Sequence, residues 1–190
     1  DVFPYIFHAE RAGFPVKIGA SYKWGKGNEL WDFNFVPPEA YEGQQRPGQY
    51  AGIRQATAFQ VDRSIYDTIL LRNAEKLGCA VWEGIAVREV EKDGDAIQSL
   101  KLSNGTSVSG KYYVDASGHV GILRRALGVE IDCPKVLKNI AIWDYWNNTA
   151  WADTIGSGGT RVQVMSVGYG WLWFIPITPI RTSLGLVCPA

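Results

Sequence analysis

Two tryptophans in one apolar run are the residues of this sequence whose types and spacing most favour chemistry. Trp171 and Trp173 stand at positions i and i+2, and Pro176 ends the run. In an extended strand the two indoles must project from the same face, so the pair predicts an indole wall along one side of a site. A core strand that contains two tryptophans only for packing is the alternative that this pattern leaves open.

One further segment carries residue types that suit a nucleotide. The run Asp115-Ala116-Ser117-Gly118 follows a predicted strand and precedes a second helix, an arrangement in which small residues let the backbone approach a nucleotide. An ordinary strand-to-helix turn is the alternative.

Composition excludes several other classes of function. The 19 basic and 19 acidic residues form no long runs, so the sequence shows no footprint for nucleic acid or an anionic membrane. The apolar stretch 171–180 is about half of the ~20 residues that a membrane-spanning helix needs. No metal site is expected, because His8 and His119 lie far apart and the cysteines form no CxxC pair. A reducing cytoplasm fits the three cysteines, which are Cys79, Cys133 and Cys188.

The elements that must position these residues follow from periodicity and turn signals. A capping box at Ser64–Asp67 predicts a helix that ends at Gly78, and a second helix is expected over 122–127. The segment Phe14–Tyr50 has little periodicity and predicts a long excursion over a surface or active site. Asn104-Gly105 predicts a hairpin whose two central residues both have positive φ. Strands are expected at 80–82, 87–90, 97–102, 107–114, 136–146, 161–167, 171–175 and 182–187.

The motifs resemble those of flavin-dependent halogenases. Trp171-Leu172-Trp173-Phe174-Ile175-Pro176 matches all fixed positions of that family's Trp-x-Trp-x-Ile-Pro motif. Residues 17–25, from Lys17 to Gly25, look like the Lys-x-Gly-Ala-x-x-x-Trp-Gly segment of its phenol- and pyrrole-directed members. Val61-Asp62-Arg63 and residues 115–118 are similar to FAD-contacting segments of the wider superfamily, which includes phenol hydroxylases and geranylgeranyl reductases.

The resemblance implies a role for each matching residue. Lys17 would be the catalytic lysine, and an ammonium there would orient hypohalous acid and make its halogen more electrophilic; a chloramine route is left open. Trp171, Trp173 and Pro176 would separate the flavin from the organic substrate and so suppress monooxygenation. The expected cofactor-binding residues are Arg63, Asp115, Ala116, Ser117 and Gly118. Arg63 would lie near the pyrophosphate, whose oxygens a guanidinium matches in pairs, and an exposed first-turn arginine is the alternative.

The resemblance also implies a reaction and its partners. Reduced FAD, supplied by a separate flavin reductase, would form a flavin hydroperoxide that oxidises chloride or bromide to hypohalous acid. The acid would halogenate an electron-rich phenol or pyrrole, either free or tethered to a carrier protein, in secondary metabolism such as antibiotic biosynthesis. The alternatives are an FAD-dependent monooxygenase or reductase on the same scaffold and a non-catalytic flavoprotein-like module.

The implied fold class is α/β with α+β mixing. Residues 1–133 are expected to form part of an FAD-binding domain of the glutathione-reductase/hydroxylase type, without its N-terminal Gly-rich phosphate loop and with an active-site excursion at 14–50. Residues 134–190 are expected to begin an antiparallel substrate-binding sheet. Because parts of the cofactor site would lie outside these residues, the chain by itself is expected to be inactive.

Overall fold

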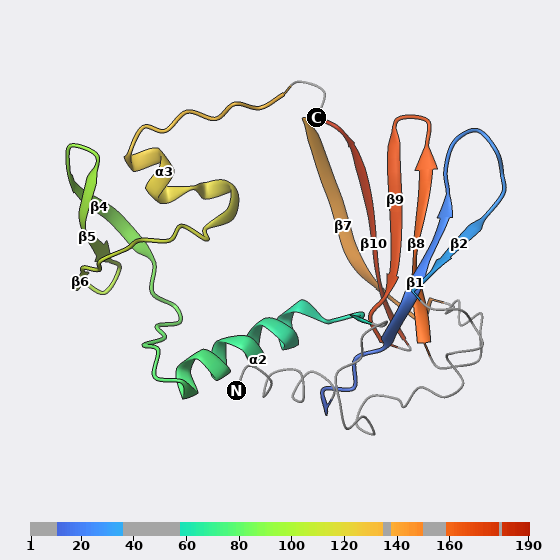
Figure 1. Cartoon of the computed structure of the whole chain (residues 1–190), viewed down its shortest axis with the longest axis horizontal. Coiled ribbons are helices and arrows are strands. Elements are labelled where there is room, and N and C mark those ends of the chain that lie inside the picture. The colour runs from blue at the N-terminus through green and yellow to red at the C-terminus, as the bar shows by residue number, and fades with distance from the viewer. Residues whose placement is uncertain (1–10, 36–57, 135–137, 150–158, 179) are drawn as a thin grey trace. The chain divides into compact units, whose positions relative to one another are not determined.

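A mixed β-sheet dominates the described part of the chain (Figure 1). The computed structural model describes residues 11–35, 58–134, 138–149, 159–178 and 180–190. The strands follow the order β2-β1-β8-β9-β10-β7, and β3 pairs with β1. Their bounds are β1 Val16–Lys23, β2 Trp31–Asn34, β3 Ala58–Phe59, β7 Asn139–Asn147, β8 Gly159–Val167, β9 Gly170–Pro176 and β10 Arg181–Pro189.

The antiparallel strands predicted for the last third of the chain are confirmed. β8, β9, β10 and β7 pair antiparallel in that order. The irregular excursion predicted from Phe14 onward is wrong in its first half, because 16–23 and 31–34 are strands of the same sheet. β1 pairs in parallel with β8, more than a hundred residues away, so local periodicity could not reveal it. Residues 36–50 of the predicted excursion, and the glycines at 156 and 158, lie outside the described residues.

The first predicted helix is confirmed as α2, Arg63–Lys76, but its cap lies two residues earlier than expected. The Asp62 carboxylate accepts the Ser64 N–H at 3.0 Å and the Ser64 hydroxyl at 2.6 Å. Ser64 therefore donates to the cap instead of forming it, which corrects the predicted capping box. The predicted apolar face is not buried among the described residues: Ile65 is 47% and Leu77 76% exposed.

A small three-stranded sheet follows, with β4 Val87–Asp93, β5 Ala96–Leu102 and β6 Ser107–Val108. The hairpin at Asn104-Gly105 is confirmed, but its turn differs from the one expected: Gly105 has φ +85°, whereas Asn104 is outside the positive-φ region. Asn104 instead accepts the Thr106 N–H through its side chain at 3.1 Å. A type I turn closed by a left-handed glycine explains both observations.

The predicted strand 80–82 and the second half of the predicted strand 107–114 are absent from the described structure, whereas the first half of the latter forms β6. Residues 80–82 and 111–114 have no strand pairing, and Val114 is 89% exposed. The apolar run at 111–114 predicted a buried strand, but such a strand needs neighbours on both sides, and no described strand pairs with it. The helix after it is confirmed as α3, Ile122–Ala126, preceded by a 3-10 turn, η2, at Gly118–Val120.

The chain divides into two compact units, residues 1–79 with 136–190, and residues 80–135. The larger unit contains the mixed sheet and α2, and the smaller one contains β4–β6 and α3. The predicted boundary at 133–134 between a cofactor domain and a substrate sheet stays a prediction. Among the described residues, no helix has the length and apolarity needed to cross a membrane.

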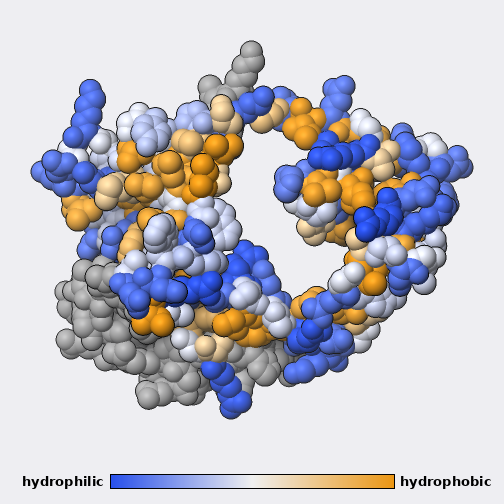
Figure 2. Space-filling view, turned by 180° about the vertical axis from the view of Figure 1, so that it is seen from behind, coloured by the Kyte–Doolittle hydropathy of each residue, from blue (hydrophilic) through white to orange (hydrophobic). Residues whose placement is uncertain are grey.

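The mixed sheet keeps much apolar surface exposed. Figure 2 shows hydrophobic side chains gathered over its strands. On the edge strand β7 the large exposed side chains belong to Ile140, Ile142, Trp143 and Trp146, which are 45%, 64%, 54% and 55% exposed. In the described part of the chain, the sheet therefore leaves part of its apolar surface uncovered.

Candidate functional site

One face of the mixed sheet carries the two tryptophans singled out from the sequence, and we call it the indole face. Trp171 and Trp173 are half-buried on β9, with ring centroids 5.8 Å apart and ring planes inclined by 50°. The predicted indole wall is therefore present as a contiguous pair. Pro176, which ends β9, is fully buried, so it closes the strand against the protein and not against solvent.

A glycine and a serine of the neighbouring strand hold the Trp173 indole. Gly185 lies directly opposite Trp173 on β10, and a Cβ at Gly185 would stand only 2.2 Å from the Trp173 ring. The indole thus lies across the β10 backbone in space that any side chain would fill. Its Nε1–H donates to the Ser183 hydroxyl at 3.0 Å, which fixes the rotation of the ring.

A row of cross-strand partners, four of them aromatic, extends the indole face from β2 to β7. Cross-strand partners share a face, and the partners of Trp173 lead in register to both edge strands. Tyr22 and Trp31 stack at 4.5 Å at one end of the row, and Trp143 stands at the other. In order across the strands the row is Trp31, Tyr22, Val164, Trp173, Gly185 and Trp143.

A β-bulge places Lys17 on this same face. Simple alternation from Tyr22 along β1 would direct Lys17 to the opposite side of the sheet. The pairing with β8 shifts register between Lys17 and Gly19, so Lys17 lies opposite Thr160, which shares a face with Val164. Bulges re-aim side chains in this way beside functional sites. Gly19 is required there because a Cβ would stand 2.0 Å from the Phe33 carbonyl oxygen.

The surroundings of Lys17 are apolar and aromatic. Its side chain is half-buried, and its Nζ lies 6.0 Å from the centroid of the Phe35 ring. Phe35 itself packs edge-to-face against Phe33, with centroids 6.1 Å apart. Lys17 therefore presents its amine beside aromatic rings on the indole face.

The structure places Lys17 and the indole pair on one face but not in contact. They stand on β1 and β9, which β8 separates. Thr160, the partner of Lys17, lies four residues from Val164, the partner of Trp173. Strand spacing and rise then put the two backbones roughly 16 Å apart. A small organic molecule fits within such a separation.

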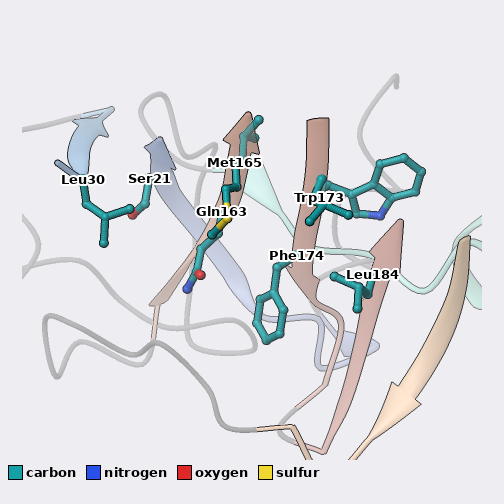
Figure 3. Close-up of a pocket in the computed structure, with 9 residues that line it drawn as sticks. Ser21, Leu30, Gln163, Met165, Trp173, Phe174 and Leu184 are labelled. Carbon is teal, nitrogen blue, oxygen red and sulfur yellow. The ribbon is translucent and has the colours of Figure 1, made fainter. Parts of the chain in front are cut away.

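A cavity of about 160 Å³ lies mainly on the opposite face of the same strands (Figure 3). Figure 3 shows the Trp173 indole directed away from the side on which Phe174 projects. The cavity is lined mostly by apolar side chains, with Gln163 and Ser21 as its polar groups. β9 thus separates two differently lined sides, as strand alternation requires.

The Val61-Asp62-Arg63 segment offers donors that suit a phosphate-bearing cofactor. Arg63 is exposed, and its guanidinium binds Asp67 through two hydrogen bonds of 2.8 and 2.9 Å, which raise the pKa of Arg63 above its ordinary value. Gln60, just before this segment, is 5% exposed, and its Nε2 has no hydrogen-bond partner among the described residues. A buried orphan donor beside an arginine at a helix start fits the oxygens of a nucleotide.

In the smaller unit, the Asp115 carboxylate organises the turn that was predicted to approach a cofactor. One of its oxygens accepts the Ser117 N–H and hydroxyl, and the other accepts the Leu123 N–H at 2.9 Å. The Ser117 bonds are the main cause that lowers the pKa of Asp115 to about 2. Asp115 therefore shapes the turn. Gly118, at φ +64°, has open space where a Cβ would stand, so its backbone is accessible to a ligand.

The low pKa of Asp115 predicts a local loss of stability in acid. The folded-state pKa of about 2 lies below the ordinary 3.8, so the carboxylate stabilises the turn fully above pH 4 and progressively less as pH falls toward 2. Amide hydrogen exchange at Ser117 and Leu123 should accelerate over this window. Asp115→Asn should show faster exchange already at neutral pH, whereas Asp95→Asn, in the exposed β4–β5 turn, should match the wild type. Equal protection in Asp115→Asn and wild type would contradict this assignment.

Sequence reasoning missed the residues that orient the site. Gly185 and Ser183 fix Trp173, and the bulge between Lys17 and Gly19 aims the lysine. One signal was available: a glycine inside the predicted strand 182–187 indicates close approach of another group. The bulge depends on pairing with β8, which no local pattern reveals.

Comparisons with known proteins agree with the motifs. The family model for tryptophan halogenase matches residues 39–189. The chain is 32% identical to tryptophan 2-halogenase of Chondromyces crocatus over 94% of its own length. It is 30% identical, again over 94% of its length, to the 1H-pyrrole-2-carbonyl-[peptidyl-carrier protein] chlorinase of Pseudomonas fluorescens. In structure it is similar to the myxobacterial chondrochloren halogenase CndH, with a TM-score of 0.77, 28% identity and 96% of this chain covered.

The chain spans only part of each of these proteins. It covers 31% of the C. crocatus relative, 42% of the P. fluorescens relative and 39% of the CndH chain. Similarity to CmlS, a flavin-dependent halogenase, follows the same pattern, with a TM-score of 0.75, 27% identity, 98% of this chain and 32% of that one. The fold predicted from the sequence, a mixed α/β flavoprotein type, is confirmed by these structures.

Proposed function

This chain belongs to the tryptophan halogenase family of flavin-dependent halogenases. From this premise we propose that its protein halogenates an electron-rich aromatic ring, with Lys17 as the catalytic lysine. The observation that carries the proposal is the shared face of Lys17 and the indole pair, which a bulge in β1 brings about. Lys17 lies near the Phe35 ring, and its distance from the tryptophan pair leaves room for a small aromatic substrate. This arrangement suits the proposed reaction.

The described residues support FAD as the cofactor. In the larger unit, Arg63 and the orphaned Gln60 amide would hold it, since they offer donors that suit its phosphates. A separate reductase would deliver FAD in its reduced form. Once bound, the reduced flavin would use oxygen to oxidise chloride or bromide. The remaining steps belong to side chains of this chain.

Lys17 would receive hypohalous acid as a hydrogen-bond donor. The ammonium would hold the oxygen of the acid and withdraw electron density, so that the halogen becomes more electrophilic toward the ring. The Phe35 ring, 6.0 Å from the Lys17 Nζ, would offer an apolar surface beside this encounter. The ring carbon bonds to the halogen as the halogen–oxygen bond breaks. The proton that the ring then loses combines with the departing hydroxide to form water.

The proposed substrate is a phenol or a pyrrole. The resemblance of residues 17–25 to the phenol- and pyrrole-directed segment supports this class. The relative from P. fluorescens, a chlorinase of a carrier-bound pyrrole, supports a pyrrole and a tethered substrate. The indole pair would keep this ring away from the flavin, so that halide and not substrate is oxidised there.

The proposal is tested on the full-length protein with reduced FAD, oxygen and bromide. It should convert members of a panel of phenols and pyrrole-2-carbonyl thioesters to monobrominated products, detected by mass spectrometry. Omitting halide should abolish these products without abolishing oxygen consumption. Hydroxylated products alone would instead assign the protein to the flavin monooxygenases, and failure to bind FAD would favour a non-catalytic module.

A further inference from the structure

A three-residue cluster ties the start of α2 to the mixed sheet. Arg181, the first residue of β10, donates from one guanidinium nitrogen to the Asp62 carboxylate at 3.0 Å. The same guanidinium lies over the Tyr145 ring on β7, 4.1 Å from its centroid. Three elements that are distant in the sequence therefore meet at one arginine.

The cluster is built at a partly desolvated position. The Asp62 side chain is 9% exposed and the Arg181 side chain 39%. Asp62 is also the N-cap of α2, and its hydrogen bonds to Ser64, with the charge of Arg181, lower its pKa. Because one carboxylate serves the cap and the ion pair together, a shift of α2 away from β10 disrupts both.

The two elements that the pair joins carry the two halves of the proposed site. Arg63 follows Asp62 directly, at the first position of α2. Arg181, Ser183 and Gly185 alternate along β10 on one face, and the latter two set the position of Trp173. The strand that binds the start of α2 is therefore the same strand that positions Trp173.

We infer that the Asp62–Arg181 pair is a positioning device that fixes the cofactor-contacting start of α2 relative to the indole pair. The inference rests on the proposed function for the identity of the ligand at Arg63. The coupling between α2 and β10 can be measured without any halogenation assay. Neither residue needs to touch the cofactor or the substrate.

The test is a double-mutant cycle in the full-length protein. Asp62→Asn removes the charge but keeps a side chain that caps helices equally well, and Arg181→Gln removes the partner. Each single change should weaken oxidised FAD binding, followed by flavin fluorescence quenching, about five- to ten-fold. The double variant should bind no more weakly than the poorer single variant, because the two changes remove one shared interaction.

Independent readouts separate positioning from general destabilisation. Amide exchange at Tyr66, which donates to the Asp62 carbonyl in the first turn of α2, should accelerate in both single variants. Arg181→Lys, which keeps the charge, should recover most of the FAD affinity. Lys101→Gln, which breaks an exposed ion pair with Glu89 and Glu91 in the smaller unit, should change neither readout.

Two results would overturn the inference. Additive losses in the double variant, or unchanged Tyr66 exchange in the single variants, would show that the pair does not couple α2 to β10. A protein that shows the coupling and binds FAD but makes no halogenated product would refute the proposed function and leave the positioning role intact. The two failures are therefore distinguishable.

Discussion

Replacing Lys17 by methionine should lower the rate of aromatic halogenation about 10²- to 10⁴-fold, the range expected when a proton-handling group is removed. Methionine keeps a long, unbranched side chain at this position but has no donor for hypohalous acid. Oxidation of bromide should continue, because it takes place at the flavin. The measurement is the initial rate of brominated product, with hypobromous acid trapped in parallel by a thioether scavenger.

Lys23 is the matched control for this change. It stands on β1 with Lys17, but strand alternation from Tyr22 directs it to the face opposite the indole face. Lys23→Met should therefore retain the wild-type rate within about two-fold. A Lys17→Met protein that brominates at an undiminished rate would remove the lysine from the mechanism and favour the scaffold's monooxygenase chemistry.

The outcome for Lys17 shows where sequence reasoning reaches its limit. The residue was identified from a motif, yet alternation along β1 alone would have assigned it to the wrong face. The bulge that corrects this arises from pairing with β8, some 140 residues later, and from the approach of the Phe33 carbonyl to Gly19. Long-range pairing energies decide such features, and local propensity does not contain them.

The predictions that held are those with a local cause. The two tryptophans share a face because strands alternate, and α2 and α3 end at Lys76 and Ala126, two residues before the glycines predicted to stop them. The strand expected at 107–114 forms only at 107–108, because the apolar run 111–114 needs partners that no described strand provides. The site residues named from the sequence stay predictions, whereas the shared face of Lys17 and the indole pair could be found only from the fold.

Moving the Trp173 indole should change which oxidation product forms. We expect the double variant Trp171→Leu/Trp173→Leu to raise the ratio of hydroxylated to halogenated product at least ten-fold, equivalent to about 1.4 kcal/mol between the two competing paths. Leucine keeps the strand apolar, so β9 should retain its pairing, while the barrier between flavin and substrate becomes smaller. Product ratios by chromatography and mass spectrometry measure this effect.

Gly185→Ala offers a second route to the same result without removing either indole. Its Cβ would stand 2.2 Å from the Trp173 ring, so the ring must rotate and release its hydrogen bond to Ser183. Overpacking of this kind costs about 1–3 kcal/mol, which leaves the fold intact but displaces the indole. Gly168→Ala, in the open β8–β9 turn, has no atom within 4 Å of its new Cβ and should preserve the product ratio. If Gly185→Ala and the double leucine variant both retain the wild-type ratio, the indole pair does not separate the two reactions, and the tryptophans serve packing alone.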